Sequence, residues 1–372
     1  MEAFGDAMLQ MIAASDWRYD IVHTNFFMSA LVAHQMRTVF GMPFVVTFHA
    51  LSRVSRQVQR DADGFPEARF TIEQQMMRQA DGIIAECEQD REDMLALYRA
   101  PAARIAVIPC GFDPDELWPV TVSAGEYLGL EATEFVVLQL GRIVPRKGID
   151  NVVRSIAILR ERHGVTARLL IVGGDSALPD PTLTPELACL MALAQELDVA
   201  RNVTFIGQRP RAALRYYYSA ADVCVTTPWY EPFGITPVEA MACGTPVVGA
   251  AVGGIKTTVL DMETGYLVPP RDPDALAERL AWLAQHPDTA QRFGWAGMRR
   301  AYRHFTWHEV ALQVARLYER AIDGAAAGFD LGSPVRVTPA VASGGTCALP
   351  SDILSCATCG ENPAVVISGG AA

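Results

Sequence analysis

The sequence predicts an α/β protein built from two doubly wound parallel domains, the first of them incomplete. Its 372 residues suggest two domains at about 150 residues each. Short β-branched segments alternate with helical stretches in two separate runs, which is typical of parallel sheets. Between the runs, residues 110–134 are rich in Pro, Gly and acidic residues, and we place the domain junction there.

The first run opens on a helix. Residues 1–14 have no basic region before their apolar stretch and no cleavage pattern, so they predict a short amphipathic helix and not a signal peptide. A doubly wound sheet usually opens with a strand and a Gly-rich turn, and none precedes Tyr19. The predicted strands are 19–23, 43–49, 82–86 and 105–109, and the predicted helices are 28–39 and 66–80.

The second run is more complete. Its predicted strands are 135–140, 168–173, 203–206, 222–226, 246–250 and 266–268. The predicted helices are 149–163, 185–197, 211–219, 237–242, 273–285 and 287–304, followed by a last helix at 307–323.

The predicted organisation has five parts. They are an incomplete first domain at 1–118, a linker at 119–134, a second domain at 135–304, a C-terminal helical segment at 305–323 closing against the first domain, and a disordered tail at 324–372. The tail holds Cys347, Cys356 and Cys359. A structural zinc site usually needs four ligands and the tail has no His, so incidental thiols are favoured over a metal site.

Composition excludes several function classes. With 31 basic and 42 acidic residues the net charge is −11, and without a basic stripe this argues against a nucleic-acid partner. A single phosphorylated ligand held by local cations stays possible. No apolar run approaches 18 residues, so no membrane span is expected. Eight scattered cysteines are too few for a disulfide scaffold, so we expect a cytoplasmic location, with peripheral association at the inner membrane face left open.

The most specific motif runs from Glu231 to Glu239, EPFGITPVE. Two glutamates bracket a Phe-Gly turn at the carboxyl end of a predicted parallel strand, where ligands bind in open α/β sheets. The turn leads into a helix whose free N–H groups favour an anion, and carboxylates suit sugar or ribose hydroxyls. The alternative is that Glu231 caps the helix and Glu239 faces solvent.

A second motif, GRIVPRKG, spans Gly141 to Gly148 directly after the strand 135–140. Its cations, including Arg142 and Lys147, suit a diphosphate clamp, and a solvated basic turn is the alternative. Neither a Walker loop nor G-x-G-x-x-G is present.

Two weaker candidates follow other strands. His49, at the end of the strand 43–49, is placed to hydrogen-bond a substrate, although a structurally satisfied His is more common, and His23 is weaker still. Gly253 and Gly254 allow close approach either of a ligand or of a tight turn.

With these motifs the chain resembles the retaining nucleotide-sugar glycosyltransferases of family 4, in the branch similar to sucrose-phosphate synthase. The resemblance covers about Tyr19 to Ala321, with PFVVTFHALSRV, ADGIIAECEQDRED and RIAVIPCGFDPDELWP extending it through the first domain. It implies the GT-B architecture of two Rossmann-like domains facing a cleft. It specifies the family well and the substrate poorly.

The resemblance also implies site roles. Arg142 and Lys147, beside Gly141, would neutralise the leaving diphosphate, and Glu239 would bind the ribose. The donor sugar would be held by Glu231 and by the backbone around Phe233, Gly234, Ile235 and Thr236. His49 would approach the donor sugar from the first domain, and His49, Arg142, Lys147 and Glu231 are the expected catalytic residues. The base pocket would be lined by Gly207, Gln208 and Arg209.

The implied chemistry needs no cofactor and no metal ion. Charge grows on the departing diphosphate, and the two cations would stabilise it; consistently, the chain has no Asp-x-Asp. The donor would be a UDP-, GDP- or ADP-sugar, and the acceptor a sugar, a sugar phosphate, a lipid or a small molecule.

One departure from the family pattern matters. The opening strand and Gly-rich loop are missing, and by the resemblance roughly a hundred N-terminal residues would be absent, so we expect a truncated chain with an incomplete acceptor domain. Two alternatives to active transfer therefore stand: a nucleotide-sugar-binding fragment without turnover, and a GT-B nucleotide-sugar 2-epimerase.

Overall fold

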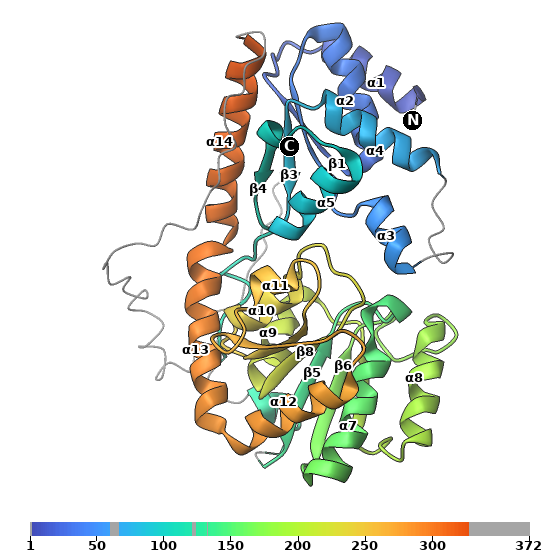
Figure 1. Ribbon diagram of the computed structural model, residues 1–372, viewed down its shortest axis with the longest axis vertical. Coiled ribbons are helices and arrows are strands. Elements are labelled where there is room, and N and C mark those ends of the chain that lie inside the picture. The colour runs from blue at the N-terminus through green and yellow to red at the C-terminus, as the bar shows by residue number, and fades with distance from the viewer. Residues whose placement is uncertain (1, 60–66, 121–123, 132, 327–372) are drawn as a thin grey trace, which may run out of the picture. The chain divides into compact units, whose positions relative to one another are not determined.

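A computed structural model describes residues 2–59, 67–120, 124–131 and 133–326 of the chain (Figure 1). Two parallel sheets with helices packed on them make up the described part, so the predicted α/β class is confirmed. The elements of the first part are α1 (Glu2–Ala13), β1 (Val22–Asn25), α2 (Phe26–Phe40), β2 (Phe44–Thr47), α3 (Ser52–Gln59), α4 (Ala68–Gln79), β3 (Gly82–Ala85), α5 (Glu88–Tyr98), a 3-10 turn (Ala102–Arg104) and β4 (Ile105–Val107).

The remaining elements form the second part and the C-terminal helix. They are α6 (Ala124–Tyr127), β5 (Phe135–Leu140), a 3-10 turn (Pro145–Lys147), α7 (Ile149–His163), β6 (Ala167–Val172), α8 (Pro185–Glu196), β7 (Val203–Gly207), α9 (Arg211–Ala220), β8 (Val223–Thr226), α10 (Ile235–Ala242), β9 (Val247–Ala250), α11 (Ile255–Thr258), β10 (Gly265–Val268), α12 (Pro273–Gln285), α13 (Pro287–His304) and α14 (Trp307–Ala326).

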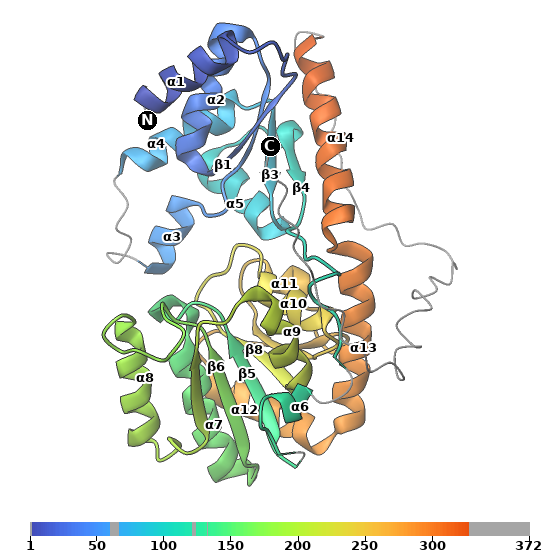
Figure 2. The ribbon, with the colours of Figure 1, turned by 180° about the vertical axis from the view of Figure 1, so that it is seen from behind.

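The first sheet has the order β1-β2-β3-β4, with every described pair parallel. This order follows the chain without a reversal, and right-handed crossovers therefore place the connecting helices on one face. Alternate side chains of β2 show the two faces: Val46 packs into the core under those helices, and Val45 packs with Leu317 of α14. The C-terminal helix thus covers the second face of the first sheet (Figure 2).

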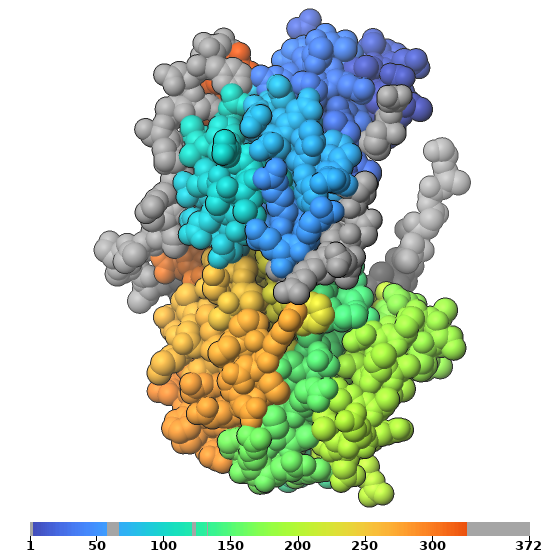
Figure 3. Space-filling model, turned by 45° about the vertical axis from the view of Figure 1, so that its right-hand side comes forward, coloured from blue at the N-terminus to red at the C-terminus, as the bar shows by residue number. Residues whose placement is uncertain are grey.

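The second sheet has the order β10-β9-β8-β5-β6-β7. The chain enters at β5, continues outward through β6 and β7, and returns to β8 on the other side of β5. This reversal makes the sheet doubly wound, and its switch point lies between the carboxyl ends of β5 and β8. One face is covered by α7, α8 and α12, and α7 and α12 lie side by side (Figure 3).

The predicted elements hold with a few corrections. The strand predicted at 19–23 is wrong at both ends, because β1 pairs with β2 from Val22 with Phe44 to Asn25 with Thr47. Helix α5 escaped prediction because its buried positions are Asp90, Met94 and Tyr98, and the acidic Asp90 interrupts the apolar pattern.

Two further corrections concern the segments around the domains. The predicted linker 119–134 contains α6, whose Tyr127 stacks on Tyr216 at 4.6 Å between ring centroids. Helix α14 extends to Ala326, three residues into the predicted tail. The rest of that tail, with Cys347, Cys356 and Cys359, lies outside the described residues. Within the described part, none of the helices is both long and apolar enough to cross a bilayer.

Candidate active site

The loops that follow β5 and β8 are held together at the switch point of the second sheet. The backbone N–H of Trp229 donates to the carbonyl oxygen of Arg146 at 2.9 Å, and the hydroxyl of Thr227 donates to the carbonyl oxygen of Gly148 at 2.9 Å. Gly148 has a φ of 62°, and a Cβ on it would collide with the carbonyl oxygen of Thr227. Only glycine allows this approach, and these contacts tie the GRIVPRKG loop to the segment after β8.

Lys147 and Glu231 meet across these two loops. The ammonium of Lys147 donates to Oε2 of Glu231, and the two side chains are only 15% and 16% exposed. The sequence alternatives of a solvated basic turn at Lys147 and of a helix cap at Glu231 are therefore wrong. The two motifs that were singled out in the sequence form one site.

The site carries an excess of positive charge. The pKa of Arg146 is lowered first by burial and then by the neighbouring charge of Arg142, while Glu231 opposes the shift. Lys147 thus pairs with Glu231, and Arg146 feels the charges of both Arg142 and Glu231, so the GRIVPRKG loop brings three cations to this region. Such a cluster is suited to bind an anion that carries more than one negative charge.

The turn between the two glutamates presents the start of α10. Gly234 is the N-cap of α10 with a φ of 90°, and a glycine has no side chain to cap the first N–H groups of the helix, which belong to Ile235 and Thr236. Phe233 is buried and packs edge-on against Phe305. The packing of Phe233 on Phe305 therefore anchors the helix N-terminus, and this N-terminus favours an anion.

Gly253 and Gly254 support this turn from behind. The N–H of Gly254 donates to the carbonyl oxygen of Glu231 at 2.9 Å, and a Cβ on Gly253 would collide with the same oxygen. Of the two sequence alternatives, the structure supports close packing of backbone on backbone at this point.

Glu239 lies on α10 with its carboxylate turned into the protein. Tyr218 donates to Oε2 at 2.8 Å, and Arg211 donates to Oε1 at 3.2 Å. Glu239 is 5% exposed, so the alternative that it faces solvent is wrong. Burial raises its pKa above the ordinary value, while the bond from Tyr218 acts in the opposite direction.

The segment Gly207–Arg209 lies at the end of β7 and is tied to the loop after β6. The N–H of Gln208 donates to the carbonyl oxygen of Ser176 at 2.8 Å, and Arg209 donates to the carbonyl oxygen of Ala177 at 2.7 Å. Arg209 also donates to the hydroxyl of Tyr217 at 3.1 Å. Tyr217 is the neighbour of Tyr218, the partner of Glu239, so α9 connects this segment with Glu239.

Gly141 lies where β5 ends, with a φ of 139°. Its N–H donates to the carbonyl oxygen of Val172 at 3.0 Å, and a Cβ on Gly173 would collide with the carbonyl oxygen of Gly141. The loops after β5 and β6 are therefore in close backbone contact at the start of the GRIVPRKG motif.

His49 follows β2 in the first domain and has a φ of 59°. Its Nδ1 lies 2.7 Å from Oε1 of Glu86, and its Nε2 lies 2.8 Å from Oδ1 of Asn25. The bond to Glu86 raises the pKa of His49, against an opposing effect of burial. The His49 side chain is 47% exposed, whereas that of Glu86 is 6% exposed. His49 is thus held at both nitrogens and still accessible.

Sequence reasoning missed Asn25 and Glu86. Asn25 is the last residue of β1, and Glu86 follows β3. Both strands neighbour β2 in the sheet. The carboxyl ends of adjacent parallel strands meet at one edge, so polar residues at those positions were the available signal. Cys110, after β4, adds a thiol that donates to Oε1 of Glu86 at 3.2 Å.

His23, the weaker histidine candidate, has structural contacts on both sides of its ring. Its Nδ1 lies 2.6 Å from the hydroxyl of Tyr318 on α14, and its Nε2 lies 2.9 Å from Oγ1 of Thr47. Burial lowers its pKa, and the charge of His49 acts in the same direction. His23 therefore connects α14 with the first sheet.

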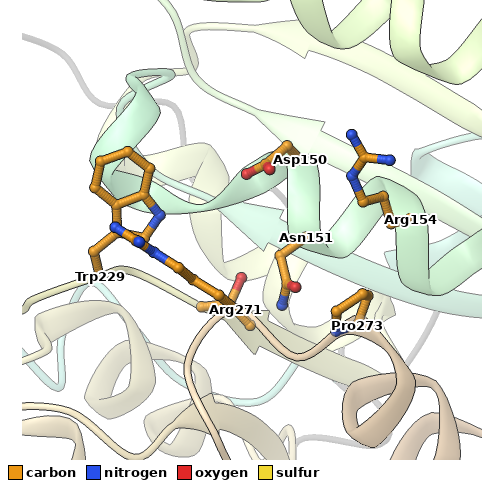
Figure 4. Close-up of a pocket in the computed structure, with 7 residues that line it drawn as sticks. Asp150, Asn151, Arg154, Trp229, Arg271 and Pro273 are labelled. Carbon is orange, nitrogen blue, oxygen red and sulfur yellow. The ribbon is translucent and has the colours of Figure 1, made fainter.

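A cavity of about 300 Å³ opens beside the GRIVPRKG loop, which carries Lys147 and is called the Lys147 loop from here on (Figure 4). Residues at the start of α7, after β8 and before α12 line it, among them Asp150, Trp229 and Arg271. None of the sequence-predicted site residues lines it. In the described ranges, no group of three or more His, Cys, Asp or Glu side chains is arranged to hold a metal ion.

Comparison with known proteins gives a consistent result. The family model described as glycosyl transferases group 1 matches residues 126–300, and the model described as glycosyltransferase family 4 matches residues 3–116. A D-inositol 3-phosphate glycosyltransferase of Corynebacterium glutamicum is 32% identical over 328 residues, covering 87% of this chain and 77% of the relative. The protein of the same name from Corynebacterium efficiens is 34% identical over 327 residues, covering 86% and 76%.

Solved structures agree with the sequence matches. A sucrose-phosphate synthase from Thermosynechococcus elongatus has 36% identity and a TM-score of 0.77, covering 87% of this chain and 78% of that one. An Anabaena protein, HepE, solved in complex with UDP and glucose, has 21% identity and a TM-score of 0.72, covering 85% and 81%. The second likeness supports the fold, and together they confirm the predicted GT-B fold class.

Proposed function

The chain belongs to the glycosyltransferases of group 1 and family 4 and is a glycosyltransferase, and from that premise we propose a retaining, metal-independent transfer from a nucleotide-diphosphate sugar to an acceptor hydroxyl. The observation that carries the proposal is the cation cluster at the switch point. Lys147 pairs with Glu231, Arg146 lies within the electrostatic reach of both Glu231 and Arg142, and the N-terminus of α10 follows Glu231 by four residues.

These cations supply the role that a divalent ion has in other transferases. A departing nucleoside diphosphate gains negative charge as the glycosidic bond breaks, and fixed positive groups stabilise that charge without reorganisation. Arg142 and Lys147 neutralise the diphosphate, and the backbone N–H groups around Phe233 and Gly234 add helix-dipole stabilisation.

The nucleoside is held by residues on the α9 and α10 side. Within the described ranges each carboxylate oxygen of Glu239 accepts from one donor, Tyr218 or Arg211, and a carboxylate offers about four acceptor positions. Positions therefore remain for the ribose hydroxyls. Gly207, Gln208 and Arg209, connected to Glu239 through α9, line the base pocket.

The reaction proceeds by attack from the face of the leaving group. The bond between the anomeric carbon and the phosphate oxygen breaks, the acceptor oxygen bonds to that carbon, and the acceptor proton passes to the departing phosphate oxygen. Glu231 holds the donor sugar together with His49.

For the acceptor we propose a phosphorylated polyol or sugar. The relatives named above are D-inositol 3-phosphate glycosyltransferases, and the similar solved structure with 36% identity is a sucrose-phosphate synthase. Both names contain a phosphorylated polyol or sugar, and this chain is 32% to 36% identical to those proteins.

A donor screen tests the proposal. UDP-glucose, UDP-N-acetylglucosamine, GDP-mannose and ADP-glucose are each incubated with D-inositol 3-phosphate or a hexose 6-phosphate, with and without EDTA. Nucleotide release is measured, and the anomeric configuration of the product is read by NMR. We expect one donor to be used, with retention and with EDTA having no effect. An inverted product, or loss of activity in EDTA, contradicts the mechanism, and donor binding without transfer supports the binding-fragment alternative.

A further inference from the structure

The cavity beside the Lys147 loop has the features of a second ligand site. It is formed by the first turns of α7, the segment after β8 and the turn before α12 (Figure 4). Its volume of about 300 Å³ lies at the lower end of the range for small-molecule pockets. Because none of the residues proposed to bind the donor lines it, a ligand here would be separate from the donor.

Two cations in this cavity have no carboxylate partner among the described residues. Arg154 and Arg271 both line it, and among the described residues neither guanidinium is in an ion pair. Arg271 lies over the ring of Trp229, 4.3 Å from its centroid, and has a φ of 58°. A non-glycine residue in this conformation is strained, and such strain clusters at ligand sites. The packing against Trp229 holds one guanidinium at the cavity wall.

A buried amide adds an unused donor. Asn151 is 5% exposed, and its Nδ2 has no hydrogen-bond partner in the part of the chain that the structure describes. Figure 4 shows this amide pointing toward the space between Arg271 and Pro273. An unsatisfied buried donor costs free energy, and a ligand oxygen bound here would remove that cost.

We propose that this cavity binds a small phosphorylated polyol or sugar. The phosphate oxygens accept from Arg154, Arg271 and the Asn151 amide, and the N-terminus of α7 adds its dipole. Asp150 contributes the only carboxylate among the residues that line the cavity, and it accepts hydrogen bonds from the ligand hydroxyls. Two cations against one carboxylate leave a net positive charge for the anion.

Occupancy of this cavity is coupled to the Lys147 loop. Trp229 and Thr227, which line the cavity, bond to the carbonyl oxygens of Arg146 and Gly148. A ligand that orders Trp229 and Arg271 therefore also orders the loop that carries Lys147. This coupling rests on the proposed function of Lys147. Binding to the cavity is therefore tested by calorimetry, which does not require activity.

Titration calorimetry with inorganic phosphate and glycerol 3-phosphate tests the proposal, with glycerol as the neutral control. We expect both anions to bind the full chain, glycerol 3-phosphate more tightly. Arg154→Gln/Arg271→Gln is expected to weaken binding about tenfold or more, since two charge-assisted hydrogen bonds are lost. Arg142→Ala/Lys147→Ala removes the donor-site cations, so anion binding at the donor site is lost in this variant. The affinity of the cavity itself is expected to change by no more than about twofold, because no charge-assisted bond in the cavity is removed.

Arg160→Gln, on the same helix but outside the cavity, is the matched control and should bind as the unaltered chain does. If the double variant does not fold, the single Arg271→Gln variant, altered at an exposed side chain, replaces it. The proposal is overturned if neither anion binds, if glycerol binds equally well, or if binding disappears in Arg142→Ala/Lys147→Ala and persists in Arg154→Gln/Arg271→Gln.

Discussion

Nδ1 of His49 lies 2.7 Å from Oε1 of Glu86, although 37 positions separate the two residues in the chain. One follows β2 and the other follows β3, so the pairing of these two strands brings them together. With Asn25 at the other ring nitrogen, His49 is oriented from both sides. A histidine chosen as a candidate for its place after a strand is thus one part of a three-residue arrangement.

Glu86→Gln should lower the pKa of His49. The hydrogen bond to Glu86 is the largest cause of the raised pKa, and the amide has no charge to replace it. NMR titration of the imidazole ring measures this directly. A ring that titrates unchanged in the variant would contradict the assigned pair.

The same pair should affect stability in a defined direction. A raised native pKa contributes stability that is fully present below the unfolded value of about 6.5 and is lost as the pH rises through the native pKa. The unaltered chain should therefore have a higher free energy of unfolding than Glu86→Gln, and this difference should be larger at acidic than at alkaline pH. The difference should be modest, because His49 is half-exposed. Urea unfolding across this pH range is the measurement.

Lys147→Ala should lower kcat/KM roughly 10²- to 10³-fold with the donor identified by the screen, because one fixed cation at the leaving diphosphate is lost. The control is Arg160→Ala. Arg160 lies near the C-terminal end of α7 and donates to the carbonyl oxygen of Asp198. Near-normal kcat/KM in a folded Lys147→Ala variant would show that the assigned role is wrong.

Gly148→Ala should destabilise the second domain more than Gly164→Ala does. Both glycines flank α7 at positive φ, 62° and 66°, so both substitutions cost about 1–2 kcal/mol of conformational strain. A Cβ at position 148 also collides with the carbonyl oxygen of Thr227, whereas no atom of the described residues lies within 4 Å of a Cβ at position 164. Unfolding free energies and kcat/KM of the two variants give the comparison, and equal losses would contradict it.

Glu239→Gln should gain stability relative to the unaltered chain as the pH rises from strongly acidic to neutral. Burial raises the pKa of Glu239, so its ionisation in the folded state costs stability that a neutral amide avoids. Donor use should fall in the same variant if Glu239 holds the ribose. Urea unfolding at several pH values, with KM for the donor, measures both effects.

Arg69→Met should destabilise the first domain by about 3–5 kcal/mol, because a buried ion pair loses one partner. Arg69 donates to Glu73 at 2.6 Å, and the two side chains are 2% and 0% exposed. The same Glu73 accepts from Tyr98 at 2.6 Å. Arg78→Met, an exposed position on the same helix, is the control and should stay within about 0.5 kcal/mol.

The second domain was predictable because its signals are local. Strands β5 to β10 are short apolar runs, and the helices between them carry the helical apolar period, so their order and most bounds follow from the residues in sequence. The EPFGITPVE and GRIVPRKG motifs were likewise found before their contact was known. The first strand and α5 were misjudged because pairing partners and a sparse buried stripe decide them.

By itself, the sequence determined the α/β class, the two parallel sheets and the motifs that carry Lys147, Glu231, Glu239 and His49. Only the tertiary structure decided which residues complete those motifs: Glu86 and Asn25 around His49, Tyr218 and Arg211 around Glu239, and Thr227 against Gly148. The reason is physical. A motif records local chain geometry, whereas the pKa, orientation and accessibility of a side chain depend on groups that strand pairing and helix packing bring from distant positions.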